Sequence, residues 1–239
     1  TKSLLEYGIK NLLLEKPAGI NQQQVDSLTQ LATDQNSKVY VAYNRRFYSS
    51  VVEAQKIIEQ DGGVSSFNFE FTEWSHRISQ KVMPKEMAHS WFLCNSSHVV
   101  DMAFFMGGWP RQLSSFVTGS LDWHPAGSTF AGAGISEHNA LFSYQANWAA
   151  PGRWRVEILT TKSRLIFSPL EKLQIQLLGS IKVDDVTVDD QLDQSFKPGL
   201  YLQTQAFLNG DKTSLLSIEA HKQHVEQVYE KMLTSQTAI

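Results

Sequence analysis

The chain has a single cysteine, Cys94, among its 239 residues. One cysteine excludes an internal disulfide, so the chain has none of the disulfide framework that holds small secreted proteins together. The N-terminus also lacks the basic, apolar and small-residue order of a signal peptide, because residues 1–10 have the pattern of an amphipathic helix. We therefore expect a reducing compartment, the cytoplasm.

Long apolar runs and an excess of charge of one sign are absent as well. The longest apolar stretches, such as residues 102–106, are far shorter than the roughly 20 residues that span a bilayer. The formal net charge is -3, from 21 basic and 24 acidic side chains. This balance provides no electrostatic surface for nucleic acid or an anionic membrane, and we expect neither as a partner.

The first 42 residues read as strand, helix, strand. Residues 11–14 form an unbroken apolar run, as in a strand buried in a parallel sheet. Asn21 is placed to cap a helix that continues to about Gln35, and residues 38–42 form the next strand. A βαβ unit of this kind implies a parallel sheet and the end of a doubly wound domain.

The pattern changes after a third predicted helix, residues 50–60. Phe67, Phe69 and Phe71 alternate with polar residues, which is the two-residue period of a strand with one covered face. Further strands are predicted near residues 112–118, 129–135, 139–148, 154–160, 163–167 and 172–177. Together they predict an open, mainly antiparallel sheet, with a loop over residues 75–87 and a helix over residues 97–106 inserted after its first strand. Two more helices, residues 201–208 and a C-terminal one, close the chain.

Three motifs occur at the ends of these predicted elements. Glu15-Lys16-Pro17 follows the first strand, and Asn44-Arg45-Arg46-Phe47 follows the second. Ser97-His98-Val99-Val100-Asp101 opens the predicted helix inside the sheet domain. With these motifs in this order, the chain resembles the Gfo/Idh/MocA family of sugar oxidoreductases over nearly its whole length.

The resemblance implies an α+β fold: the remnant of a doubly wound Rossmann domain followed by an open, mainly antiparallel sheet domain with flanking helices, as in dihydrodipicolinate reductase and glucose-fructose oxidoreductase. It divides the chain into residues 1–47, the C-terminal part of an NAD(P)-binding domain; 48–200, a substrate-binding and oligomerisation domain; and 201–239, helices that pack back across both. Gly-x-Gly-x-x-Gly occurs nowhere. We therefore expect upstream sequence in the complete protein, with NAD or NADP as its cofactor and little or no activity for this chain alone.

In this family the Lys of Glu-Lys-Pro lies beside the nicotinamide and the substrate hydroxyl, so the resemblance gives that role to Lys16. An ammonium there would stabilise the oxyanion that develops as hydride leaves carbon, and partial burial would bring its pKa nearer to working pH. The structural alternative is a surface lysine just beyond a strand. Its position at the carboxyl end of a parallel strand, where open α/β sheets bind ligands, favours the functional interpretation.

The resemblance implies that His98 faces the substrate, where a neutral imidazole could accept the hydroxyl proton. Asp101, three residues on, is expected to orient the helix or His98. The alternative for His98 is a structural histidine satisfied by a carboxylate. Many relatives carry Asp four residues before this histidine, whereas this chain has Cys94, whose thiol is mostly neutral at pH 7 and cannot replace a carboxylate.

The remaining expected site residues also come from the resemblance. Cofactor binding is expected of Glu15, Lys16, Pro17, Asn44 and Arg45. Substrate binding is expected of Arg45, Trp91, Cys94, Asn95 and His98. For Arg45 the structural alternative is a hinge arginine paired with a carboxylate. The seven histidines show no metal-ligand spacing, so no metal is expected.

The resulting functional expectation is an NAD(P)-dependent oxidoreductase acting on a sugar, cyclitol or nucleotide-sugar hydroxyl or carbonyl, with Lys16 and His98 handling the proton. The alternative is a non-catalytic member that keeps the fold as a ligand sensor or as a regulatory or dimerisation protein. In either case the resemblance implies a homo-oligomer formed through the face of the antiparallel sheet.

Overall fold

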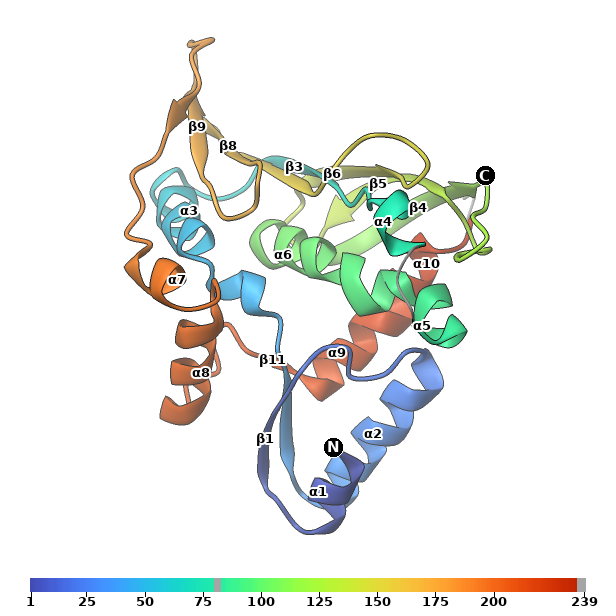
Figure 1. Cartoon of the computed structure of the whole chain (residues 1–239). Coiled ribbons are helices and arrows are strands. Elements are labelled where there is room, and N and C mark those ends of the chain that lie inside the picture. Colours follow the sequence, from blue (N-terminus) through green and yellow to red (C-terminus); the bar gives the residue numbers. More distant parts are fainter. Residues whose placement is uncertain (80–82, 236–239) are drawn as a thin grey trace.

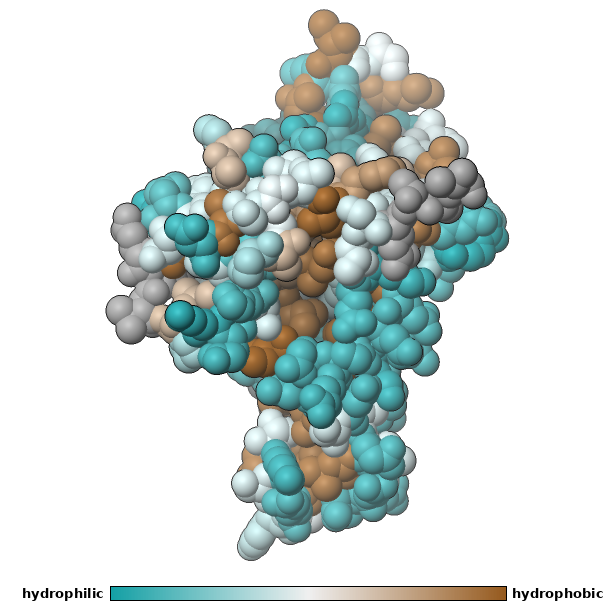
Figure 2. Space-filling model, turned by 90° about the vertical axis from the view of Figure 1, so that its right-hand side faces the viewer, coloured by the Kyte–Doolittle hydropathy of each residue, from teal (hydrophilic) through white to brown (hydrophobic). Residues whose placement is uncertain are grey.

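The structure is a computed structural model that describes residues 1–79 and 83–235. It contains two sheets, with the smaller one and its helix α2 below the larger one in Figure 1. Figure 2 shows the face on the right-hand side of Figure 1, where hydrophilic residues cover most of the surface and hydrophobic residues gather in a hollow near its middle. No helix within the described ranges is long and apolar enough to cross a bilayer.

The smaller sheet has the strand order β1-β2-β11. β1 (Asn11–Leu14) and β2 (Lys38–Val41) are parallel, and β11 (Leu216–Ser217) pairs antiparallel with β2. The crossover is α2 (Gln22–Asp34), which is capped by Asn21 because its side chain accepts the Gln24 N–H at 2.9 Å. The predicted βαβ unit is confirmed, while the helix predicted over residues 1–10 is only α1 (Lys2–Glu6).

The larger sheet has the strand order β10-β9-β8-β7-β3-β6-β5-β4. In chain order its strands are β3 (Ser66–Glu70), β4 (Pro110–Thr118), β5 (Thr129–Ser136), β6 (Leu141–Asn147), β7 (Arg155–Leu159), β8 (Ser163–Phe167), β9 (Gln174–Leu177) and β10 (Asp184–Asp185). Only the β3 and β6 pair is parallel among these neighbours, so the predicted mainly antiparallel sheet is confirmed.

One face of this sheet is covered by helices. Figure 1 places α3 (Ser49–Gln60) and α6 (Ser97–Gly107) on the same side of it. Phe67 and Phe69 of β3 point to that side and contact the ring of Phe104 in α6, with ring centroids 5.9 and 5.3 Å apart. The alternation read from the sequence therefore marks the buried face correctly.

The other helices connect the two sheets or flank them. They are η1 (Asn44–Phe47), α4 (Ser75–Ile78), α5 (Lys85–His89), η2 (Phe92–Ser96), α7 (Gln191–Ser195), α8 (Leu200–Asn209), α9 (Ile218–His224), η3 (Val225–Tyr229) and α10 (Glu230–Met232). The loop predicted over residues 75–87 was wrong in part, because α4 and the start of α5 lie within it; its residues 80–82 lie outside the described ranges.

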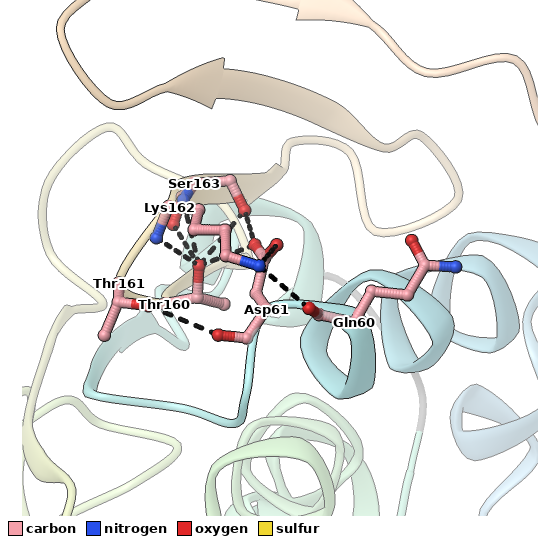
Figure 3. Close-up of polar contacts among 6 residues, drawn as sticks. All are labelled: Gln60, Asp61, Thr160, Thr161, Lys162 and Ser163. Atoms are coloured by element: carbon pink, nitrogen blue, oxygen red, sulfur yellow. Dashed lines mark hydrogen bonds and ion pairs between the residues drawn. The ribbon is translucent and has the colours of Figure 1, made fainter.

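The end of α3 is fixed to the turn between β7 and β8 by polar contacts (Figure 3). Asp61 accepts hydrogen bonds from the hydroxyls of Thr160 and Ser163 at 2.7 and 2.5 Å. Lys162 donates to the carbonyl of Gln60 at 3.0 Å. Since α3 leads out of the smaller sheet, this contact fixes the direction in which the chain enters the larger one.

Candidate functional site

Side chains from three elements meet where the two sheets adjoin. Lys16 follows β1, Tyr43 follows β2, and Ser97 opens α6. The ammonium of Lys16 donates to the Ser97 hydroxyl at 3.0 Å and to the carbonyl of Leu93 at 2.7 Å, and the Tyr43 hydroxyl lies 3.2 Å from the same Ser97 oxygen. Lys16 also lies over the Tyr43 ring, 5.8 Å from its centroid. The lysine is therefore held in one position by groups 77 and 81 residues away in the chain.

The carbonyl that binds Lys16 belongs to an unusual helical turn. Residues Phe92–Ser96 form a π-helical turn, η2, directly before α6. Hydrogen bonds in such a turn reach five residues instead of four, and π-turns inside helices occur often at functional sites. Here the wider turn presents the Leu93 carbonyl to Lys16.

The electrostatic state of Lys16 is strongly altered. The pKa of Lys16 is lowered from 10.5 to about 7, mainly by burial; Cys94 acts to raise it, and the positive charge of Arg45 acts to lower it. An ammonium has three donors, and two of them are used by Leu93 and Ser97. The third has no partner within the part of the chain that the structure describes. A substrate oxygen would be a suitable acceptor for it.

His98 lies beside this group, with its ring edge-on to that of Tyr43 at a centroid distance of 5.6 Å. Burial lowers the pKa of His98 well below 6.5, and the positive charges of Lys16 and Arg45 lower it further. His98 is therefore neutral at pH 7. Its Nδ1 atom is buried and has no hydrogen-bond partner among residues 1–79 and 83–235.

Asp101 does not contact His98 in any hydrogen bond that the described residues make. Instead it forms a buried ion pair with Arg46, the arginine of the Asn-x-Arg-Phe motif. The arginine that pairs with a carboxylate is thus Arg46 and not Arg45. Through this pair Asp101 orients α6. Arg45 donates to the side chain of Asn44 at 2.8 Å, and Asn44 donates to the carbonyl of Pro198 at 2.8 Å.

The structure also places Glu15, Pro17 and Asn95. Glu15 is exposed and accepts the Lys16 backbone N–H at 3.2 Å, and the peptide bond between Lys16 and Pro17 is cis. Asn95 donates to both carboxylate oxygens of Glu73, at 2.9 and 3.1 Å.

Cys94 is half-buried, and burial raises the pKa of its thiol. Trp91 is buried, and its ring lies edge-on to that of Trp123 with centroids 6.2 Å apart.

Sequence reasoning gave no role to Glu73 or Ser97. Glu73 is 2% exposed and accepts from the Ser96 hydroxyl at 2.7 Å and from the indole N–H of Trp154 at 3.3 Å. Burial raises the pKa of Glu73. The only sequence signal for Ser97 was its place at the start of the Ser97 to Asp101 motif; nothing in the sequence marked Glu73, because its partners are more than 20 residues away.

The described residues offer a contact to one end of a dinucleotide only: the third donor of the Lys16 ammonium could bind an oxygen of the nicotinamide or of the substrate. The chain has no Gly-rich turn to hold a pyrophosphate. No three metal-ligating side chains come together within the described ranges.

No protein-family model matches the sequence, and comparison with curated proteins finds no match. Solved structures do match the fold. Levoglucosan dehydrogenase in complex with NADH and levoglucosan superimposes with a TM-score of 0.74 at 17% sequence identity, covering 97% of this chain and 74% of that chain. An inositol dehydrogenase homolog from Azotobacter vinelandii, complexed with NADH and myo-inositol, gives 0.72 at 15% identity, covering 97% and 70%.

A third match is the super-repressor mutant of Gal80p from Saccharomyces cerevisiae, with a TM-score of 0.72 at 14% identity, covering 97% of this chain and 73% of that chain. The chain therefore has the fold of the Gfo/Idh/MocA-type oxidoreductases, as the three motifs predicted. At these identities the similarity is one of fold.

Proposed function

We propose that this chain is the substrate-binding part of an NAD(P)-dependent oxidoreductase that acts on a hydroxyl or carbonyl of a sugar, cyclitol or nucleotide sugar. The observation that carries the proposal is the state of Lys16. Its ammonium is held by Ser97 and Leu93 at the carboxyl end of a parallel strand, has a pKa of about 7, and keeps one donor free. The folds of the levoglucosan and inositol enzymes support the same class of substrate.

Lys16 rather than His98 is the proton-transfer group in this proposal. A catalytic acid or base works best when its pKa lies near the operating pH, and Lys16 meets that condition at about 7. In the oxidation direction the substrate O–H bond breaks and the proton goes to the neutral amine of Lys16. In reduction the ammonium returns it. The pKa of His98 is too far below 7 for the same work, so His98 serves as a neutral hydrogen-bonding partner of the substrate.

Ser97 and Tyr43 position the amine. The Ser97 hydroxyl also donates to the Leu93 carbonyl at 2.9 Å, so the two groups that hold Lys16 are fixed to each other. Glu15, Lys16, Pro17, Asn44 and Arg45 would line the nicotinamide side. When bound, NAD(P) supplies the hydride acceptor or donor.

The test is dehydrogenase activity of the complete protein on a panel of sugars and cyclitols. Replacing Lys16 with Ala should lower kcat/KM by about 100-fold or more, the usual contribution of a positioned acid or base. Lys38→Ala is the matched control, since Lys38 is exposed at the start of β2. Full activity of Lys16→Ala would overturn the assignment. The 239-residue chain alone should bind NAD(P) weakly or not at all.

A second candidate is a non-catalytic ligand sensor. Cys94 stands where many relatives of the resembled family have Asp, and the fold match to the Gal80p super-repressor mutant shows that the same architecture occurs in a repressor. A sensor would bind a sugar-like ligand without turning it over. Binding of a ligand by the complete protein, with no cofactor-dependent turnover of that ligand, would favour the sensor.

We also propose that the chain self-associates through the open face of the larger sheet. Leu141 on β6 and Phe116 on β4 lie on this face, since Phe116 is in register with Gln145 through β5, and they are 62% and 51% exposed. Phe116→Lys should lower the mass measured by analytical ultracentrifugation to that of a monomer. Phe196→Lys, at an equally exposed phenylalanine just after α7, should leave it unchanged.

A further inference from the structure

Three arginines and two tryptophans stack alternately beside the site. The guanidinium of Arg45 lies 5.4 Å from the ring centroid of Trp154, and Arg153 lies 4.5 Å from the same ring. Arg153 also lies over Trp74 at 5.0 Å, and so does Arg77. We call this series, from Arg45 to Arg77, the arginine ladder. It places three permanent positive charges in a row.

The charges of the ladder are only partly compensated. Within residues 1–79 and 83–235 its single ion pair is the one between Arg153 and Glu73, at 3.5 Å. Burial lowers the pKa of Arg45, and the charge of Arg153 acts in the same direction, while Tyr48, Glu171 and Glu15 act against it. The Nε atom of Arg45 is buried and has no partner among those residues. Arg77, at the other end, is exposed. An anion beside the ladder would therefore meet donors that are not already paired.

A cavity adjoins the ladder at Trp74, the one ladder residue in its wall. It has a volume of about 630 Å³, and its wall includes Trp74, His76, Trp148 and the turn that ends at Gly152. Trp74 is fixed in this wall because its indole N–H donates to the carbonyl of Gly152 at 3.0 Å. Aromatic walls with a few polar groups are typical of small-molecule sites, and this volume would hold a sugar ring with a substituent.

Hydrogen bonds to one helical turn, η2, link a wall residue of the cavity to Lys16. Glu73 lines the cavity and accepts hydrogen bonds from Asn95 and from the Ser96 hydroxyl, both in η2. Leu93, in the same turn, accepts the hydrogen bond from Lys16. Arg45 begins the ladder next to that lysine, and its charge lowers the pKa of Lys16. The ladder thus leads from the proposed reaction centre toward the cavity.

We propose that the arginine ladder binds the anionic group of a saccharide, a sugar carrying a carboxylate or a phosphate, whose other end reaches Lys16. The proposal rests on the function proposed above for the reacting end. Guanidinium groups match carboxylate and phosphate oxygens in a two-point geometry, which a neutral sugar cannot use. The proposed binding of an anionic group narrows the substrate class from sugars in general to acidic or phosphorylated sugars.

The experiment is calorimetric binding to the 239-residue chain at low ionic strength. The probes are methyl glucoside, methyl glucuronide, glucose 1-phosphate and inorganic phosphate. We expect the two anionic sugars to bind about tenfold more tightly than the neutral glucoside, with a preference that weakens as salt is added. Arg77→Gln and Arg153→Gln should each lower this preference at least about threefold. Arg111→Gln is the control, because Arg111 is exposed at the opposite end of the sheet strands.

Equal binding of the glucoside and the glucuronide, or no binding of any probe by a chain that circular dichroism shows to be folded, would overturn the proposal. So would a preference for anionic sugars that survives the double replacement of Arg77 and Arg153. Phosphate binding as tight as that of glucose 1-phosphate would overturn the saccharide part. None of these results depends on turnover, so they are separate from the Lys16→Ala test of the proposed function.

Discussion

Arg46 donates to both carboxylate oxygens of Asp101, through Nε at 2.8 Å and through Nη2 at 2.7 Å. Both side chains are buried, with 6% and 0% exposed. The two residues lie 55 positions apart, on η1 and α6, so the pair joins the end of the smaller sheet to the helix that covers the larger one. Since α6 also carries Ser97 and His98, this pair fixes the side chains that face Lys16.

Asp101→Asn should lower the free energy of unfolding by about 3 to 5 kcal/mol, because it leaves the buried guanidinium of Arg46 without a counter-charge. Urea denaturation measures this loss. Glu53→Gln is the control: Glu53 pairs with Lys56 at 2.7 Å on the exposed side of α3, and such pairs contribute about 0.3 to 0.5 kcal/mol. A loss for Asp101→Asn no larger than that of the control would contradict the structural role assigned to the pair.

Much of the fold was predictable because its signals are local. Asn21 caps α2 as predicted, and Phe67 and Phe69 point to the helix-covered face as their spacing required. The two-residue strands β10 and β11 were not predictable, since each exists only through pairing with a strand elsewhere. The π-turn in η2, Phe92–Ser96, was missed because four of its five residues are weak helix formers and the turn depends on continuing into α6.

The candidate site was predictable where a motif carried it. Lys16 and His98 stood in motifs, and both lie close to Tyr43 in the folded chain. The partners that determine their state were not predictable. The contact between Lys16 and Ser97 spans 81 residues, and the pKa of His98 depends on burial that only the packed structure creates.

Replacing Lys16 with Met should stabilise the fold by about 1 to 2 kcal/mol at pH 6. Desolvation of the half-buried ammonium destabilises the folded state, and solvent screens only part of this effect. The folded-state pKa of about 7 lies below the usual 10.5. Between these values the unfolded chain binds more protons, so the stability of the unmodified chain rises with pH. The advantage of the variant should therefore shrink between pH 7 and pH 10. Urea denaturation at pH 6, 8 and 9.5 checks this, and a difference that does not change with pH would contradict it.

Cys94→Asp should raise the pKa of Lys16 by about one unit or more, because a carboxylate near an ammonium favours its charged form. Cys94 already acts in this direction on the pKa of Lys16, but burial raises the pKa of the thiol, so a carboxylate would carry the negative charge at lower pH than the thiol does. In the complete protein the pH dependence of kcat/KM would move to higher pH by the same amount. Cys94→Ser, which cannot carry a charge, should not move the profile to higher pH. Without turnover, the reactivity of the Lys16 amine toward an acylating reagent as a function of pH reports the same shift.

Asp61→Ala should lower the free energy of unfolding by about 2 kcal/mol at pH 7, because it removes the charged acceptor of the Thr160 and Ser163 hydroxyls. The hydrogen bond from Ser163 holds the pKa of Asp61 below its usual 3.8, and that from Thr160 adds to the effect. A carboxyl group with a lowered pKa stabilises the fold above pH 4 and loses that contribution as pH falls through the folded-state value. The difference from the unmodified chain should thus be constant from pH 5 to 7 and decrease below pH 4.

Asp34→Ala, at an exposed position near the end of α2, should change stability by less than about 0.5 kcal/mol at any of these pH values. An Asp61→Ala loss that is equally large at pH 3 would show that the contact at the end of α3 is held by packing and not by the charge of Asp61.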